Sequence, residues 1–436
     1  MNRRAPEVLA PVGSPDCLPA AVAGGADAVY LGLRHFNARG RAENFRKADL
    51  ARNVAYLHGH RVKCYVVMNT LVHDDEYPKA LDLARCAADA GVDAVIVQDL
   101  GLWSVLAREV PGLKRHASTQ MTIHHASQIE VLARLGAERV ILARELTLAE
   151  VAACTERAHE LGVETEHFVH GALCYAFSGQ CLMSNFAGCR SANRGTCAQN
   201  CRFDYVQRAP SSVLRPLSDS ATAPVSPTSD AASPDTELSM KDLSLIARVA
   251  ELADIGVASL KIEGRLKGPE YVHTVSRAYR EAVDAWVART PFDVASARER
   301  LKDVFSRANS DAPLSGGYGS SARLHRYDPA QDRSPDAELV SCDRARGEVV
   351  VAAKGEITAG QGYAYSVGFH TGGFLVTRAD RGRTPGSWKL SVRIAEHGPR
   401  LPAGLALFRN ADHERKREAA AAMARVPVPT ADADTV

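Results

Sequence analysis

The sequence predicts an α/β fold: a (β/α)8 barrel of the TIM type, followed by a small antiparallel β domain. Eight short apolar runs alternate with longer amphipathic segments through the first part of the chain, which is typical of a parallel sheet with helical crossovers. Further along, short alternating strands are separated by glycine-containing turns, which indicates antiparallel pairing. An open doubly wound sheet is the alternative, but no strand reversal in the pattern supports it.

Each predicted barrel strand is a β-branched or apolar run. The runs are EVLAPVG from Glu7, DAVYLG from Asp27, RVKCYVVMN from Arg61, DAVIVQD from Asp93, KRHAST from Lys114, RVILARE from Arg139, ETEHFVHG from Glu164 and ASLKIEG from Ala258. Amphipathic segments such as YPKALDLARCAADAG lie between them, and several end in a glycine that suits a helix C-cap. A long helix, PEYVHTVSRAYREAVDAWVA, follows the last strand and closes the barrel.

These patterns divide the chain into four predicted parts. They are a barrel domain over residues 1–292, a connector over 293–330, a small β domain with a terminal helix over 331–425, and a disordered tail over 426–436. The barrel domain contains a cysteine-rich insertion after the seventh strand, residues 171–205, and a Ser/Pro/Ala/Asp-rich loop, residues 209–236. That loop has too few large apolar residues to fold, so we predict that it is disordered.

The composition is that of a globular protein, with 46% hydrophobic and 24% charged residues and a net charge of +2. Such a charge does not by itself indicate a nucleic-acid or membrane partner. The N-terminal residues lack an apolar run of signal-peptide length, and no segment approaches the roughly 18 apolar residues of a membrane span. We therefore expect a cytoplasmic protein, in which clustered cysteines indicate a metal site or catalysis rather than disulfides.

Polar residues recur where the predicted strands end, which is where active sites of such barrels lie. The group comprises Asn69, Gln98, Asp99, Ser118, Thr119, Gln120, Arg144, Glu145, His170, Glu263 and Arg265. Arg144, His170, Glu263 and Arg265 are the candidate catalytic residues, expected around a small anionic co-substrate because arginine binds carboxylates bidentately. Asn69, Gln98, Asp99, Thr119 and Gln120 are candidate substrate-binding residues. Helix capping or ion pairing is an equal alternative for Ser118, Thr119 and Glu145.

The cysteine-rich segment holds the candidate metal ligands Cys174, Cys181, Cys197 and Cys201. Their spacing, C-x₆-C and then C-x₃-C, leaves zinc and an iron–sulfur cluster equally open, and Cys189 is left over. Residues 167–203 include no Asp or Glu. The same segment carries Arg190, Arg194 and Arg202 as candidate substrate contacts, since cations there would favour a negatively charged cluster, RNA or a carboxylate.

Two stretches of this segment resemble the signature of the U-thirty-two peptidase family. They are EHFVHGALCYAFSGQCLMS, from Glu166, and RSANRGTCAQNCRFDY, from Arg190. The resemblance extends from LAPVGSPDCLPAAVAGGADAVYLG through HASTQ, VILAREL, LSMKDL and SLKIEGRLKGPEYV. Some members of the family are labelled collagenase-like proteases. Others add hydroxyl groups to cytidine of 23S ribosomal RNA, to wobble uridine of tRNA or to ubiquinone precursors, some of them depending on prephenate, and the ubiquinone pair carries 4Fe–4S clusters.

The resemblance implies an iron–sulfur-dependent enzyme that hydroxylates a cytidine or uridine in rRNA or tRNA with a prephenate-like co-substrate. The RSANRG motif is most similar to the ribosomal RNA branch. In some relatives the fourth cluster ligand follows the KDL motif, where this chain has Ser244, so Cys201 is put forward instead. The alternatives are a collagenase-like peptidase, a ubiquinone-biosynthesis hydroxylation protein and a non-catalytic, zinc-stabilised RNA-binding module. A basic stretch of the β domain around Trp388 is a further expected RNA contact, through phosphate contacts and base stacking. A solvated basic hairpin with a half-buried tryptophan is the alternative.

Overall fold

The computed structural model describes most of the barrel domain and most of the small β domain. The described residues are 4–203, 238–302, 304, 309–316, 335–353, 355–367, 370–395, 399–411 and 413–426. The predicted loop 209–236 lies outside the described residues, as do residues 204–205 of the cysteine-rich segment, much of the predicted connector 293–330 and residues 427–436 of the predicted tail.

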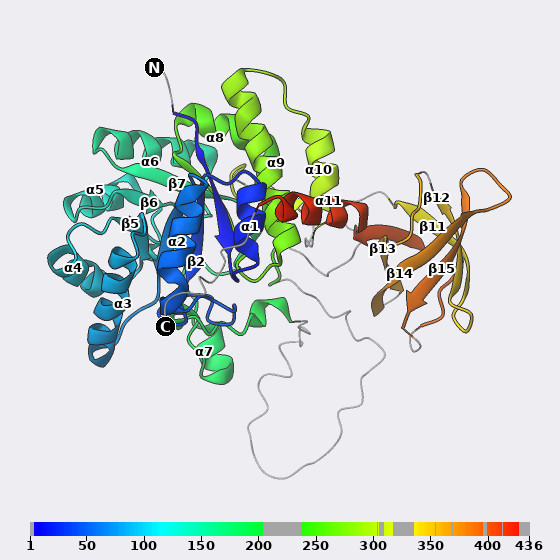
Figure 1. The fold of residues 1–436 in the computed structure, drawn as a ribbon, viewed down its shortest axis with the longest axis horizontal. Helices are drawn as coiled ribbons and strands as arrows, with labels where there is room; N and C mark the ends of the chain where they lie inside the picture. The colour runs from blue at the N-terminus through cyan, green and yellow to red at the C-terminus, as the bar shows by residue number, and fades with distance from the viewer. Residues whose placement is uncertain are drawn as a thin grey trace, which may run out of the picture.

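A parallel barrel forms the larger part of the chain (Figure 1). Its strands are β1 (Glu7–Val12), β2 (Ala28–Gly32), β3 (Lys63–Met68), β4 (Ala94–Val97), β5 (Arg115–Ala117), β6 (Arg139–Ile141), β7 (Glu164–Ala172) and β9 (Ser259–Ile262). Neighbouring strands pair in parallel from β1 to β7, and β9 pairs with both β7 and β1. Within the described residues these eight strands therefore close the predicted (β/α)8 barrel.

Helices surround the barrel, and their buried apolar side chains belong to the same hydrophobic core as the strands. They are α1 (Cys17–Ala23), α2 (Leu50–Gly59), α3 (Tyr77–Asp89), α4 (Leu100–Glu109), α5 (Ala126–Arg134), α6 (Leu148–Glu160), α8 (Val249–Ile255), α9 (Pro269–Ala288) and α10 (Val294–Lys302). In α3 the buried side chains are Ala80, Leu83, Ala84 and Ala87, a spacing that places them on one helical face. No helix of the described residues combines the length and the apolar character that crossing a membrane requires.

The cysteine-rich segment and the chain after it add elements that the sequence did not predict. Helix α7 (Met183–Gly188) lies within the segment, and the short strands β8 (Asp242–Ser244) and β10 (Asn309–Ser310) extend the sheet. Strand β8 runs antiparallel to the end of β7, with Ser244 opposite His170. The predicted KDL motif is thereby fixed at the mouth of the barrel.

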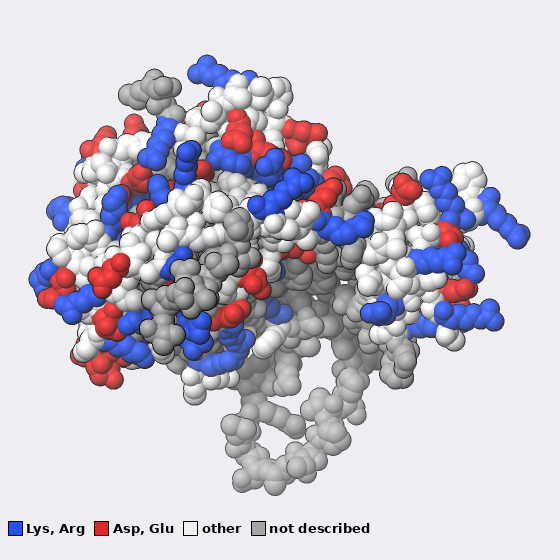
Figure 2. Space-filling view, in the orientation of Figure 1, with Lys and Arg blue, Asp and Glu red and all other residues white. Residues whose placement is uncertain are grey.

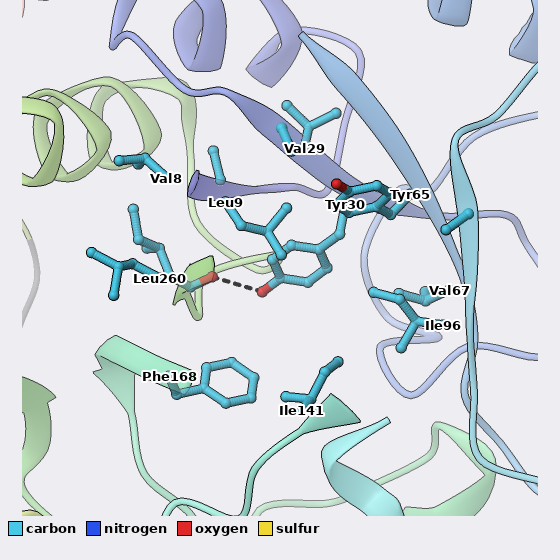
Figure 3. Packing of buried hydrophobic residues seen from close by; sticks show 14 of the residues in the cluster. Val8, Leu9, Val29, Tyr30, Tyr65, Val67, Ile96, Ile141, Phe168 and Leu260 are labelled. Carbon is cyan, nitrogen blue, oxygen red and sulfur yellow. Dashed lines mark hydrogen bonds between the residues drawn. The ribbon is translucent and has the colours of Figure 1, made fainter. Parts of the chain in front are cut away.

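The barrel interior has a charged lower layer and an apolar upper layer. In the lower layer Arg139 bonds Glu7 at 2.8 Å and Glu166 at 3.1 Å, and Lys261 bonds Glu166 at 2.6 Å. Figure 3 shows the apolar layer, in which Tyr30, Val67, Ile96, Ile141 and Phe168 point inward from different strands. The hydroxyl of Tyr30 donates to the carbonyl of Ile262 at 2.8 Å, so its ring is held across the barrel (Figure 3).

The small β domain is a closed antiparallel barrel with its own hydrophobic core. Its strands are β11 (Ala337–Asp343), β12 (Glu348–Ala353), β13 (Gly362–Val367), β14 (His370–Arg381), β15 (Ser387–Ile394) and β16 (Ala406–Ala411). The terminal helix α11 (His413–Ala424) leaves this domain and packs on α1 and α9 of the larger barrel (Figure 1). Met423 contacts the larger core, so the last helix ties the two domains together.

Candidate active site

A cavity of about 460 Å³ opens at the carboxyl ends of the barrel strands, beneath the cysteine-rich segment. Its floor is the apolar layer of the barrel, and its roof comes from residues 174–184, 192–193 and 197–201. Seven predicted site residues line it together: Asn69, Thr119, Gln120, Arg144, Glu263, Arg265 and Ser118. The barrel thus gathers side chains that lie up to two hundred positions apart in the sequence.

Four cationic side chains and one carboxylate define the chemistry of this cavity. The cations are Arg39, Arg144, Lys261 and Arg265, and the carboxylate is Glu263. Arg39 bonds Glu263 through Nε at 3.2 Å and Nη2 at 3.1 Å. Lys261 is paired below the cavity with Glu166 and also lies 4.4 Å from the ring centroid of Tyr30. The cations lining the cavity therefore outnumber its carboxylate.

Arg144 is the cation with the least compensation. Its side chain is buried, and its Nε has no hydrogen-bond partner among the described residues. Its guanidinium carbon lies 5.7 Å from the ring centroid of Phe168. The adjacent carboxylate of Glu145 does not pair with it, because that carboxylate accepts bonds from the backbone N and the hydroxyl of Ser178, at 2.9 and 2.7 Å. A buried, unpaired guanidinium is costly, and an anion in the cavity would remove that cost.

Arg265 is held by an amide and by a tight backbone turn. Its Nη2 donates to Oδ1 of Asn37 at 2.9 Å, whereas Nη1 has no partner among the described residues. A Cβ atom on Gly13 would lie 1.8 Å from the carbonyl oxygen of Arg265. Glycine at position 13 is therefore required for Arg265 to reach the cavity.

Burial and charge shift the proton affinities of these groups. Burial alone would raise the pKa of Glu263, but the guanidinium groups of Arg39, Arg265 and Arg144 lower it below its usual value. Burial lowers the pKa of Arg265 to about 10 and also lowers the pKa of Lys261. Near neutral pH Glu263 is therefore ionised and Arg265 remains charged, and together with Arg39 they leave the cavity with a net positive field.

The cysteine-rich segment is fixed over the cavity by hydrogen bonds and by close backbone approaches at its glycines. The hydroxyl of Thr122 donates to the carbonyl of Ser178 at 2.7 Å. Gly179 has a φ of +88°, and a Cβ there would lie 2.8 Å from Cα of Gln120. Only glycine adopts this left-handed conformation so close to another backbone without strain, so the segment can sit directly on the strand ends.

The three arginines predicted as substrate contacts have different surroundings. Arg194 pairs with Glu76 at 2.7 Å and donates to the carbonyl of Leu71 at 2.9 Å. Arg202 donates to the hydroxyl of Ser239 at 2.9 Å and to the carbonyl of Leu173 at 2.5 Å. These two side chains anchor the segment, while Arg190 is exposed.

All four predicted ligand cysteines line the cavity, whereas Cys189 is exposed outside it. Burial raises the pKa of Cys201, and the thiolates of Cys174 and Cys197 raise it further, so these three sulfur atoms lie within electrostatic reach of one another. Glu263 raises the pKa of Arg39, and Tyr30 and Cys174 add smaller contributions in the same direction. Among the described residues no three His, Cys, Asp or Glu side chains form a group that could hold a metal ion. In this conformation the sulfur atoms share one cavity without converging on one point.

Of the predicted catalytic and substrate-binding residues at the strand ends, three lie outside the cavity. His170 is buried behind it, with Nδ1 3.4 Å from the hydroxyl of Tyr279 and its ring packed near Tyr271. Asp99 caps α4 by accepting from the backbone N of Leu102 at 2.8 Å and also accepts from Tyr77 at 3.0 Å. Gln98 lines a neighbouring groove. The barrel therefore brings together Arg144, Glu263 and Arg265 but separates His170 from them.

Sequence reasoning missed Arg39 and Lys261. Arg39 lies in an irregular loop after β2, where no pattern marks it. Lys261 left a signal, because a lysine inside the apolar run ASLKIEG must be buried in a parallel barrel and a buried lysine needs a partner. A lysine inside a buried strand therefore indicates a charged group at the site.

The small β domain carries exposed basic residues, and Figure 2 shows Lys and Arg along its outer side. Several are paired with acidic neighbours: Arg378 with Asp380, Arg381 with Glu356 and Lys389 with Glu348. The expectation that Trp388 stacks on bases is wrong for this conformation, because its side chain is buried in the domain core. The guanidinium carbon of Arg381 lies 5.5 Å from the ring centroid of Trp388.

Comparison with known proteins shows to which family this chain belongs. The profile described as peptidase family U32 matches residues 13–321. The chain belongs to peptidase family U32. One relative, the tRNA hydroxylation protein P1 of Bacillus subtilis, is 34% identical to this chain over 307 residues. The match covers 70% of this chain and 69% of that protein. The family resemblance drawn from the cysteine-rich segment is thereby confirmed.

Two further U32 relatives carry different names. A protein of Porphyromonas gingivalis named collagenase is 36% identical over 75% of this chain and 77% of its own length. The 23S rRNA 5-hydroxycytidine C2501 synthase of Escherichia coli is 39% identical over 64% of this chain but only 39% of its own length. The relatives of this chain thus include proteins named for RNA hydroxylation and one named collagenase.

Proposed function

We propose that this U32 protein is an enzyme that hydroxylates a pyrimidine base, cytidine or uridine, in ribosomal RNA or tRNA. The observation that carries the proposal is the cavity in which a surplus of buried cations faces four cysteines. Relatives named for hydroxylation of tRNA and of 23S rRNA support RNA as the substrate class. Replacing C–H by C–OH is a two-electron oxidation that adds one oxygen atom, so the reaction needs an oxidant and a source of that oxygen beside the base, and a co-substrate and an electron-transfer group bound there would have to supply both.

The cation cluster would hold a small carboxylate co-substrate of the prephenate type. The guanidinium of Arg144 has an unsatisfied Nε, and Arg265 has an unsatisfied Nη1 among the described residues. A carboxylate can accept from such groups bidentately. Glu263 is held by Arg39. It would therefore leave Arg144 and Arg265 free to bind the co-substrate, and its own role would be to orient the arginines or to accept a proton from the substrate.

The four cavity cysteines would hold an iron–sulfur cluster of the 4Fe–4S type. Thiolate is the ligand that such a cluster requires, and the four cysteines line one cavity, although their sulfur atoms do not converge in this conformation of the described residues. Burial raises the pKa of Cys201, and Cys174 and Cys197 raise it further, as expected if thiolates there repel one another. Bound iron would relieve that repulsion. When bound, a cluster would supply electron transfer next to the base.

RNA would approach from the side of the cysteine-rich segment. Over residues 167–203 the chain has no acidic residue, and Arg190 and Phe186 are exposed there, Phe186 to 87%. Arginine contacts phosphate and aromatic rings stack on unpaired bases. The exposed basic residues of the small β domain would add further phosphate contacts.

A peptidase is the second candidate because a relative of similar coverage is named collagenase. A cysteine peptidase needs a histidine beside its thiol. His170 is only four residues from Cys174 in sequence, but its Nδ1 faces Tyr279, and burial lowers the pKa of His170 to about 3. This placement supports hydroxylation over proteolysis.

The decisive experiment is a gene deletion followed by mass spectrometry of nucleosides from ribosomal RNA and tRNA. Loss of one hydroxylated pyrimidine is expected. Unchanged RNA with altered quinone intermediates would assign the protein to ubiquinone synthesis, and no change in either would favour the peptidase. A colourless protein that contains one zinc ion and leaves RNA unmodified would instead indicate a zinc-stabilised RNA-binding module.

A further inference from the structure

A second groove, with a volume of about 640 Å³, runs beside the cavity over the loops that follow β3, β4 and β5. It shares two lining residues with the cavity, Gln120 and Gln180. These two amides form the boundary between the two spaces. The two spaces are therefore neighbours, and a substrate chain that passes Gln120 and Gln180 would reach both.

The groove combines an apolar wall with amide groups. Leu71, Leu100 and Val131 are exposed along it to 43%, 57% and 52%. Gln98 is nine-tenths buried at its base, and its Oε1 has no hydrogen-bond partner among the described residues. The Oε1 of Gln120 is likewise unpartnered there. Buried amide oxygens without partners are rare in folded proteins, so these two acceptors call for a donor on a ligand.

The groove also offers no unengaged charged side chain, among the described residues, to an ionic ligand. Asp99 is its only charged lining residue among those described, and its carboxylate is already occupied by Leu102 N, Tyr77 and Val72 N. Gln128 is engaged by the backbone N of His124 and by the carbonyl of Thr122. A neutral, flat ligand with hydrogen-bond donors at its edge fits this lining.

We propose that the groove binds the nucleobase next to the one that enters the cavity. This inference rests on the proposed RNA substrate and names the part of the site that reads sequence. The base would lie against Leu100 and Val131 while its exocyclic amino or imino group donates to Gln98 and Gln120. Glutamine recognises base edges in this way, and unpaired bases are read on their exposed edges.

The test is a pool of RNA hairpins with a randomised five-nucleotide loop, from which the purified full-length protein selects binders. The wild-type chain should enrich one base at one loop position. Gln98→Leu, which keeps the side-chain volume, and Val131→Asp should remove that enrichment and weaken binding about tenfold. Val287→Asp is the matched control, because Val287 is exposed to 55% on α9 away from the groove.

Unchanged enrichment in both groove variants would overturn the inference, as would a wild-type protein that selects no hairpin. A loss of binding to gelatin peptides in these variants, with RNA binding unchanged, would assign the groove to a protein substrate and overturn it as well. Nucleoside analysis of the deletion strain tests the proposed reaction separately. Failure of the proposed hydroxylation and failure of the proposed base-binding groove would therefore appear in different experiments.

Discussion

Arg39 and Glu263 are joined by two hydrogen bonds of 3.2 and 3.1 Å across 224 positions of the sequence. The pair occupies the one carboxylate that lines the cavity among the described residues. As a result, Arg144 remains buried without a carboxylate partner in the described part of the chain. The positive charge of Arg144 is thus left uncompensated because Arg39, a residue that no sequence pattern marked, engages Glu263.

Replacing Arg144 with alanine should lower the yield of modified nucleoside by roughly 100-fold or more, because it removes a preoriented donor from a buried site. The measurement is nucleoside mass spectrometry in a deletion strain complemented with the variant. Arg134→Ala is the control, since Arg134 is exposed on α5. The visible absorption of the purified protein should be the same in both variants. Full activity of Arg144→Ala would show that the pocket is misassigned.

Serine at Cys174, Cys181, Cys197 or Cys201 should each cause loss of iron and acid-labile sulfide from anaerobically purified protein. Each of these cysteines lines the cavity, and a cluster needs thiolate ligands. Cys189→Ser should retain both elements, because Cys189 is exposed outside the cavity. Iron content that is equal in all five variants would contradict the proposed ligand set.

Alanine at Gly13 should reduce modification while leaving the iron content intact. The new Cβ would meet the carbonyl of Arg265 at 1.8 Å, so the backbone that carries Arg265 must move. Gly59→Ala is the matched control, because a Cβ on Gly59 meets no atom within 4 Å. Equal activity of the two variants would mean that the position of Arg265 does not matter for the reaction.

Alanine at Arg139 should destabilise the fold by about 3–5 kcal/mol, because it leaves the buried carboxylates of Glu7 and Glu166 without their shared cation. Lys114→Ala removes an exposed ion pair with Glu138 and should cost less than about 1 kcal/mol. Urea denaturation followed by circular dichroism measures both. A similar midpoint for the two variants would show that the charged lower layer is dispensable.

Acid should destabilise the folded chain through two buried histidines. Burial lowers the pKa of His167 to about 4 and that of His170 to about 3, from an ordinary value of 6.5. Below pH 6.5 the unfolded chain therefore binds more protons than the folded chain, so stability falls as the pH decreases towards these values, by roughly 1.4 kcal/mol per pH unit for each histidine.

The variant His170→Asn should make this loss shallower. Denaturant unfolding at pH 7, 6 and 5 gives the slope for each protein. Exposed His35 provides the control, since His35→Asn should leave the slope as it is in the wild-type chain. Parallel slopes for wild type and His170→Asn would show that His170 is protonated in the folded state.

The sequence determined the barrel, its strand order and the place of the site. Alternating apolar runs and amphipathic helices allow few other arrangements, and parallel strands carry their following residues to one mouth. For that reason Asn69, Thr119, Gln120, Arg144, Glu263 and Arg265 could be found from the sequence and do line one cavity. The four cysteines could be found in the same way, since the segment that holds them follows β7.

Only the tertiary structure decided which of these groups face the cavity and which pair with one another. His170 lies in the same strand-end layer but on the far side of the backbone, against Tyr279. Arg194 and Arg202 turn inward to anchor the segment, and Glu145 bonds Ser178. Arg39 joins Glu263 from a loop without regular structure. Such choices depend on distances between residues remote in sequence, and periodicity carries no information about them.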